Sequence, residues 1–101
     1  MEKNLNPESK FSALAPFLKD ARVKAGLQQK DVADALGYTS VQFVSNWERG
    51  LRAPPGKTLI RLAKMYKISI DDLYQILLEE RISQTKKELQ DMLFGRKSRA
   101  K

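Results

Sequence analysis

Residues 26–50 read GLQQKDVADALGYTSVQFVSNWERG, and this stretch decides the fold. Its three glycines stand before, between and after two short runs of helix-forming residues. Glycine ends helices because it adopts a left-handed backbone without steric cost. Each run also places its apolar residues on one face, at steps of three or four. The stretch therefore predicts a helix from residue 28 or 29 to 36, a turn over 38–40, and a second helix over about 40–49.

Similar patterns flank this pair of helices on both sides. Upstream, apolar residues at steps of three and four predict a helix over about 12–25, with Pro16 tolerated in its first turn. Downstream, the same spacing predicts a helix over about 56–66 and another that starts near Ile70. Ser69 is placed to cap this last helix. No segment alternates as a strand does, so the sequence predicts an all-α fold.

A further apolar stripe follows the fifth predicted helix. No Gly or Pro interrupts residues 79–94, which predicts either a long extension of the fifth helix or a sixth helix. A stripe of this kind must bury against something. We expect it to pair with a second copy of the chain, and the alternative is packing against its own domain. The candidate dimer residues are Ile82, Leu89, Met92 and Leu93.

Composition narrows the classes of function. The 101-residue chain carries a formal charge of +7 and contains neither Cys nor His. Disulfides, the usual zinc sites and the Ser-His and Cys-His nucleophile arrangements are therefore unavailable. The carboxylates are scattered, and no glycine-rich loop suits a phosphate. We expect no enzyme activity, no catalytic residue, no metal and no cofactor.

Charge is distributed unevenly along the chain. Residues 10–70 carry eleven Lys or Arg and four Asp or Glu, a sum of +7. Residues 71–94 sum to −3, with three basic and six acidic side chains, and residues 95–101 sum to +4. A basic middle segment indicates a polyanionic partner, although it also serves solubility.

The sequence divides into four segments. We expect a flexible N-terminal arm over 1–10, a helical domain over 11–78, a C-terminal helix over 79–94 and a basic flexible tail over 95–101. No apolar run is long enough to span a membrane, and the polar N-terminus does not resemble a signal peptide. We therefore expect a cytoplasmic protein with no membrane partner. A chain of this length leaves no room for a separate sensing domain, so no small-molecule effector is expected.

Several motifs fall in the order found in one protein family. The motifs are GLQQKDVADALG (26–37), VSNWERG (44–50), Pro54-Pro55, Thr58-Leu59, Leu62-Ala63 and ISIDDL (68–73). They resemble the helix-turn-helix domain of phage repressor and Cro proteins, the XRE-like family, and the likeness covers about residues 14–78. The resemblance implies a five-helix repressor-like bundle, here followed by a C-terminal helical extension. One departure is an apparent extra residue between Gly37 and Val44, which shifts assignments near 40–42 by about one position.

The resemblance also implies a function. The chain would be a sequence-specific regulator of transcription, a repressor that binds double-stranded DNA as a homodimer and is nucleoid-associated. The second helix of the motif would read the major groove, where each base pair shows a distinct pattern of donors and acceptors. The residues expected to contact bases are Val41, Gln42, Ser45 and Asn46. Those expected to contact phosphates are Gln29, Ser40, Arg49, Arg52 and Lys57.

Other residues of the motif have structural roles in this interpretation. Arg22 and Glu48 resemble a family pair that bonds the first helix to the end of the third. Trp47 lies three residues from Val44 and is expected in the core. Tyr38 and Phe43 are expected either to pack over the turn or to lie partly exposed near DNA.

A second hypothesis keeps the fold and changes the function. The chain would be a protein-interaction module, such as an antitoxin-like protein or a co-regulator, with the C-terminal helix as its binding element. The basic middle segment and the polar outer face of the helix over 40–49 argue against this as the sole role.

Overall fold

Five helices account for most of the residues that the structure, a computed structural model, describes, which are 11–95. They are α1 (Leu14–Lys24), α2 (Gln29–Leu36), α3 (Gln42–Glu48), α4 (Gly56–Tyr66) and α5 (Ile70–Phe94). No strand occurs in residues 11–95, and the expected all-α class is confirmed. The arm predicted over 1–10 and the tail predicted beyond Gly95 lie outside the described residues. None of the described helices is long and apolar enough to cross a membrane.

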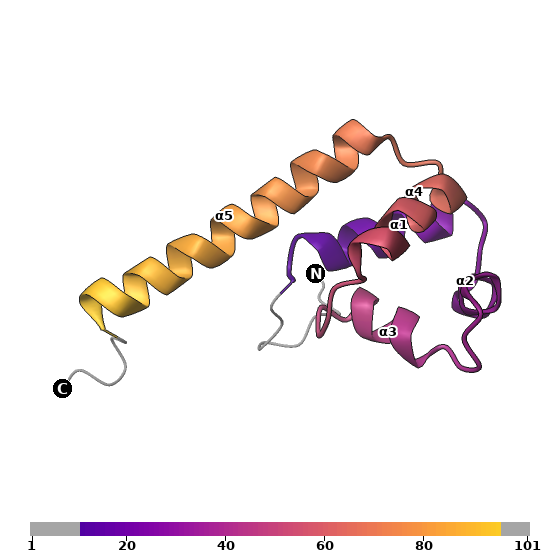
Figure 1. Cartoon of the computed structure of the whole chain (residues 1–101), viewed down its shortest axis with the longest axis horizontal. Coiled ribbons are helices and arrows are strands. Elements are labelled where there is room, and N and C mark those ends of the chain that lie inside the picture. The colour runs from indigo at the N-terminus through magenta and orange to yellow at the C-terminus, as the bar shows by residue number, and fades with distance from the viewer. Residues whose placement is uncertain (1–10, 96–101) are drawn as a thin grey trace.

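Helix α1 is the centre of the arrangement, because it contacts α3, α4 and α5. Figure 1 shows α1–α4 gathered at one end of the long α5. The core between them is formed by side chains that the periodicity placed inward, with Trp47 among them as expected. The most deeply buried large side chains are Leu14, Leu18, Val32, Val44 and Leu62.

The first four helices end in the same hydrogen-bond pattern. One residue adopts a left-handed backbone, and the next residue donates its N–H to the carbonyl five positions back. These bonds are Leu27 to Arg22, Tyr38 to Ala33, Leu51 to Asn46 and Ile68 to Ala63. The left-handed residue is a glycine in three cases, as predicted, but α4 uses Lys67 at φ +59°.

The start of α3 differs from the prediction. The helix begins at Gln42 instead of near Ser40, because Val41 stands before it with φ −86° and ψ +3°. The hydroxyl of Ser40 accepts a hydrogen bond from the backbone N–H of Gln42 at 3.2 Å. Ser40 makes this bond from within the turn, because it does not occupy the N-cap position of α3. Residues 38–41 therefore form the turn, and α3 starts directly after it.

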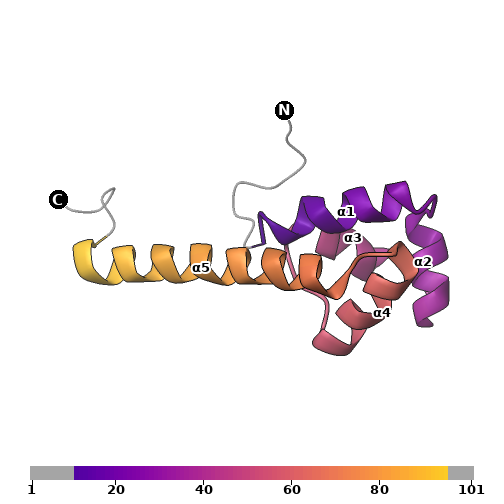
Figure 2. The ribbon, with the colours of Figure 1, turned by 90° about the horizontal axis from the view of Figure 1, so that it is seen from above.

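Helix α5 runs unbroken to Phe94, so the C-terminal stretch is an extension and not a sixth helix. Ser69 caps it as predicted, accepting from Asp72 N–H at 3.0 Å. The predicted boundary between residues 78 and 79 is therefore no break in the structure. Figures 1 and 2 both show the C-terminal half of α5 extending beyond the other helices.

One contact across that boundary joins α5 to α1. Glu80 is buried, and its Oε1 accepts hydrogen bonds from the backbone N–H groups of Ala13 at 3.0 Å and Leu14 at 2.8 Å. No side chain near the start of α1 caps that helix. Glu80 therefore supplies the cap from a distant part of the chain.

Candidate nucleic-acid interface

The outer face of α3 carries polar side chains that the sequence predicted to meet DNA. Val44, Trp47 and Glu48 are buried, whereas Gln42 and Arg49 are exposed. Ser45 and Asn46 are half-buried on the same outer side of the helix. A helix of 3.6 residues per turn places 42, 45, 46 and 49 together, so the structure brings four of the predicted residues onto one face.

Gln42 and Asn46 are joined by a hydrogen bond. Gln42 Nε2 donates to Asn46 Oδ1 at 3.0 Å, one helical turn away. The bond leaves the Gln42 carbonyl oxygen as an acceptor and the Asn46 amide nitrogen as a donor. An adenine edge in the major groove offers a donor at N6 and an acceptor at N7. The pair can therefore bind one adenine, with the Gln42 oxygen accepting from N6 and the Asn46 nitrogen donating to N7.

Aromatic rings pack over the turn before α3. The Tyr38 ring lies 4.7 Å from the Phe43 ring and 6.1 Å from the buried Trp47 ring, centroid to centroid. Tyr38 is half-buried between α2 and α3 and packs over the turn, which is one of the two roles expected of it. Phe43 packs on Tyr38 but leaves about half of its surface exposed, 51%, beside the outer face of α3. Val41, at the start of α3, is also exposed.

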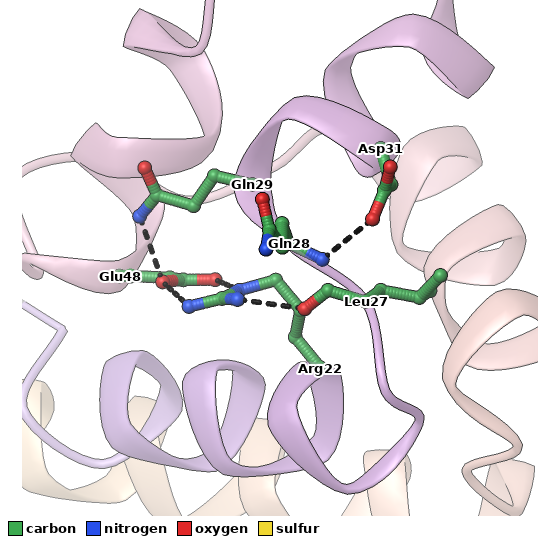
Figure 3. A network of polar contacts seen from close by, with 6 residues as sticks. All are labelled: Arg22, Leu27, Gln28, Gln29, Asp31 and Glu48. Atoms are coloured by element: carbon green, nitrogen blue, oxygen red, sulfur yellow. Dashed lines mark hydrogen bonds and ion pairs between the residues drawn. The ribbon is translucent and has the colours of Figure 1, made fainter.

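A buried ion pair ties α1 to α3 (Figure 3). Arg22 Nε lies 2.6 Å from Glu48 Oε2, and Arg22 Nη2 lies 3.0 Å from Glu48 Oε1. The third donor of the guanidinium, Nη1, bonds the carbonyl of Leu27 at 2.8 Å. Two parallel bonds fix the orientation of both side chains as well as their separation.

The hydrogen bonds to Glu48 raise the pKa of Arg22 against the opposing effect of burial. Burial, followed by the charge of Glu48, also raises the pKa of the Tyr66 phenol above its ordinary range. Tyr66 therefore stays a neutral member of the core beside the ion pair.

Gln29, expected at a phosphate, takes part in the same network. Its side-chain nitrogen donates to Glu48 Oε1 at 3.0 Å, which connects the start of α2 to the end of α3 (Figure 3). Asp31 accepts the neighbouring backbone N–H of Gln28 at 2.8 Å. The start of α2 is thus held against α3 before any ligand arrives.

The three predicted phosphate-contacting cations lie in and around the loop after α3. Arg49, Arg52 and Lys57 are exposed, and none forms an ion pair with another residue of 11–95. Ser40 is exposed in the turn on the other side of α3. The predicted residues therefore lie in the turn, on the outer face of α3 and in the following loop, with Gln29 at the start of α2 and Lys57 at the start of α4.

Two stabilising contacts of this region were missed by the sequence analysis. Gln29 reaches Glu48, and Arg61 Nη2 donates to the last-turn carbonyl of Ala35 at 3.0 Å. Each joins residues distant in the chain, and no local pattern signals such a pair. In residues 11–95, no three His, Cys, Asp or Glu side chains gather closely enough to hold a metal ion.

The predicted dimer residues lie far from this interface, on α5. Ile82, Leu89, Met92 and Leu93 are all exposed, by between 47% and 68%. They do not fold back onto the domain, which was the alternative to pairing.

Comparisons with known proteins find similar sequences for the part of the chain that holds α2 and α3. The family model described as Helix-turn-helix matches residues 18–73. The HTH-type transcriptional regulator ImmR of Bacillus subtilis is 41% identical over 61 residues, 60% of this chain and 47% of that protein. The HTH-type transcriptional regulator DdrOP3 of Deinococcus deserti is 39% identical over 62 residues, 61% of this chain and 47% of that protein.

A third relative is the uncharacterized HTH-type transcriptional regulator YqaE of Bacillus subtilis, 36% identical over 76 residues, 73% of this chain and 65% of that protein. The match spans about half the length of the first two relatives. No solved structure matches the chain significantly.

Proposed function

Because this chain belongs to the helix-turn-helix family, we propose that it is a sequence-specific, double-stranded DNA-binding regulator of transcription that acts as a repressor. The observation that carries the proposal is the polar outer face of α3, where the exposed Gln42 and the half-buried Asn46 are bonded to each other. The matched relatives are named transcriptional regulators, which supports the same class of function.

Base recognition in this proposal comes from α3 in the major groove. Gln42 and Asn46 bind an adenine edge through the acceptor and donor that their mutual bond leaves free. Val41 contacts a thymine methyl, and Ser45 bonds a neighbouring base. Non-polar contact and amide pairing together distinguish A·T from the other base pairs.

Affinity comes mainly from phosphate contacts on both sides of α3. Gln29 and Ser40 bind one stretch of backbone, and Arg49, Arg52 and Lys57 bind the other. Such contacts set the position of the helix in the groove and carry little sequence information. The network of Arg22, Glu48 and Gln29 holds α2 and α3 in a fixed relation, so base and phosphate contacts form together.

The protein acts as a homodimer in the cytoplasm, associated with the nucleoid. Two copies place two α3 helices on a two-fold symmetric site, with half-sites about one helical turn apart. The exposed apolar residues of α5 supply the surface for pairing. Repression then follows when the bound dimer covers sequence that the transcription machinery needs.

The test is selection from a random duplex DNA pool with the purified full chain at about 150 mM salt, a physiological ionic strength. The expected result is a palindromic site with an A·T pair at a fixed place in each half-site. The matched control is the double variant Gln42→Ala, Asn46→Ala, which keeps the phosphate-contacting residues. The proposal fails if both proteins enrich the same sequences, or if neither enriches any.

The exposed apolar face of α5 also favours a second candidate function, a protein-interaction module. In that case the wild-type chain selects no DNA, and a charged substitution on α5, such as Leu89→Asp, abolishes binding to a partner protein. DNA selection that requires Gln42 and Asn46 would contradict it as the sole function.

A further inference from the structure

Helix α5 has two faces that point in opposite directions. The first contacts the domain through Leu73 and Glu80, both buried, with Ile76 and Leu77 packed against the same core. The second lies on the other side of the helix and is exposed. Its residues are Leu78, Ile82, Thr85, Leu89 and Met92, which we call the α5 seam.

The seam has the spacing of a helix that pairs with one other helix. Its residues follow at steps of four, three, four and three. This alternation keeps the apolar row facing a single partner helix, as in a two-stranded coiled coil. Charged side chains border most of the row on both sides. Glu79 and Lys86 border one side, where the exposed Leu93 follows them, and Arg81 and Glu88 border the other.

We propose that the α5 seam binds the same seam of a second copy, with the two α5 helices antiparallel. Leu78 then faces Leu89 of the partner subunit, and Ile82 faces Thr85 of the partner subunit. The inference rests on the homodimer of the proposed function, and it specifies which surface pairs, in which direction and in which register.

The bordering charges select this arrangement. In the antiparallel register given, Arg81 lies beside Glu88 of the partner subunit, and Glu79 lies beside Lys86 of the partner subunit. The two-fold axis repeats both pairs, which gives four attractions. All four side chains are exposed, and none has an ion-pair partner elsewhere in residues 11–95.

Other arrangements bring like charges together. Sliding the antiparallel pair by one heptad in one direction sets Arg81 against Arg81 of the partner subunit, and in the other direction Glu88 against Glu88 of the partner subunit. A parallel pair sets Arg81 beside Lys86 of the partner subunit. Charges at these bordering positions choose partner and orientation, while the apolar seam supplies most of the affinity.

The domain leaves most of the seam open to a second helix. Helices α1 and α4 pack on the face of α5 that carries Leu73 and Glu80, and Phe17 of α1 also borders a shallow pocket beside Leu78 and Ile82. The C-terminal half of α5 extends free of them in both views (Figures 1 and 2). The first part of α5 packs on the domain through Leu73 and Glu80, and the helix continues unbroken from there to Phe94. Pairing therefore does not have to nucleate the C-terminal half of α5.

Cross-linking tests direction and register together. The chain has no cysteine, so engineered thiols react without background. The full-length single variants Leu78→Cys and Leu89→Cys are oxidised separately and as an equal mixture without DNA, one of them carrying a tag that changes its mass. The antiparallel register predicts a disulfide only between the two different variants. Disulfides within each variant alone would indicate a parallel pair and overturn the proposal.

Charge reversal gives an independent test by sedimentation equilibrium. Arg81→Glu should weaken dimerisation about tenfold, since it replaces two attractions with two repulsions. The double variant Arg81→Glu, Glu88→Arg should restore the wild-type affinity. Lys87→Glu is the control, because it makes the same charge change at an exposed position away from the seam. Tighter dimerisation of Arg81→Glu would overturn the proposal, because a parallel pair gains an attraction from that change.

The outcomes separate this inference from the proposed function. A wild-type chain that stays monomeric at 100 times the concentration used for DNA selection, yet selects a half-site, overturns the pairing alone. A chain that dimerises in the register given but selects no DNA overturns the proposed function and leaves the pairing in place.

Discussion

Glu80 accepts a hydrogen bond from the backbone N–H of Leu14 at 2.8 Å, across 66 positions of sequence. The same oxygen accepts from Ala13, so one carboxylate satisfies two free amides at the start of α1. A negative charge at that end also complements the helix dipole. Together with the packing of Leu73, Ile76 and Leu77 in the core, this carboxylate fixes the projecting helix α5 to the helix at the centre of the domain.

Removing this cap should destabilise the domain. Glu80→Ala leaves two amides without an acceptor and should lower the free energy of unfolding by about 2–3 kcal/mol. Glu80→Gln keeps an acceptor without the charge and should cost about 1 kcal/mol. Urea denaturation measures both changes. The neighbouring exposed Glu79→Ala should change stability by less than about 0.5 kcal/mol. Equal losses of stability for Glu79→Ala and Glu80→Ala would contradict the capping role of Glu80.

The ion pair of Arg22 and Glu48 should show strong coupling in a double-mutant cycle. Arg22→Met or Glu48→Met alone leaves a buried charge without its partner and should lower the free energy of unfolding by about 3–4 kcal/mol. The double variant should cost at least about 2 kcal/mol less than the sum of the two.

The exposed pair Lys30 and Asp34, 3.3 Å apart on α2, gives the comparison. Its coupling should stay below about 0.5 kcal/mol. Additive effects of the Arg22 and Glu48 changes would show that the pair is not a unit.

Lys67 ends α4 in the left-handed backbone conformation, which is unfavourable for any residue that carries a side chain. Lys67→Gly should therefore stabilise the protein by about 0.5–1 kcal/mol. Lys64→Gly, the same substitution three residues earlier inside α4, should destabilise it by about 1 kcal/mol. Thermal or urea denaturation of the two variants should give changes of opposite sign. Destabilisation by both would contradict the conformation of Lys67.

Tyr66 should make stability fall in alkaline solution. Its phenol has a raised pKa in the folded protein, so the folded state binds this proton more tightly than the unfolded chain does. The stabilisation of the folded state by this proton is fully present below the ordinary pKa of about 10 and is lost as pH rises above it. Tyr66→Phe should flatten the decline of stability above about pH 10, measured by urea denaturation. An equal decline in the wild type and in Tyr66→Phe would contradict this role of the phenol.

The recognition residues and the loop cations should differ in their effects on DNA binding. Gln42→Ala or Asn46→Ala should cost about 1–3 kcal/mol at the base read and relax the preference there. Arg52→Ala should weaken binding to all sequences and reduce the salt slope by about one. Titration of the selected site and of a scrambled duplex at several salt concentrations distinguishes the two behaviours. A uniform loss for Gln42→Ala would contradict its role at a base.

Local signals in the sequence predicted most of the helices. Gly26, Gly37 and Gly50 mark ends that need a left-handed residue, and the apolar steps between them place Val44 and Trp47 in the core. The end of α4 was located by its apolar pattern, but its left-handed residue was not, because lysine gives no signal of that conformation. The start of α3 was placed two residues early, because Ser40 looks like a helix cap while its hydroxyl acts from the turn.

The contacts of the candidate site were predictable only where the family resemblance supplied them. Arg22 and Glu48 were paired on that basis. The bonds from Gln29 to Glu48 and from Glu80 to Leu14 join parts of the chain that periodicity treats separately. Their partners are set by how whole helices pack, which is decided by the core and not by local spacing.

Because α5 is unbroken, its length sets both the distance and the direction from the domain to whatever binds the far end of the helix. Each residue added after Glu80 would lengthen the helix by about 1.5 Å and turn everything beyond it by about 100°. One added residue would turn Leu89 and Met92 away from their present direction, whereas seven would restore it and move them outward by about 10 Å. Related chains can therefore change the length of this helix only in steps close to whole heptads if the same surface is to keep its direction.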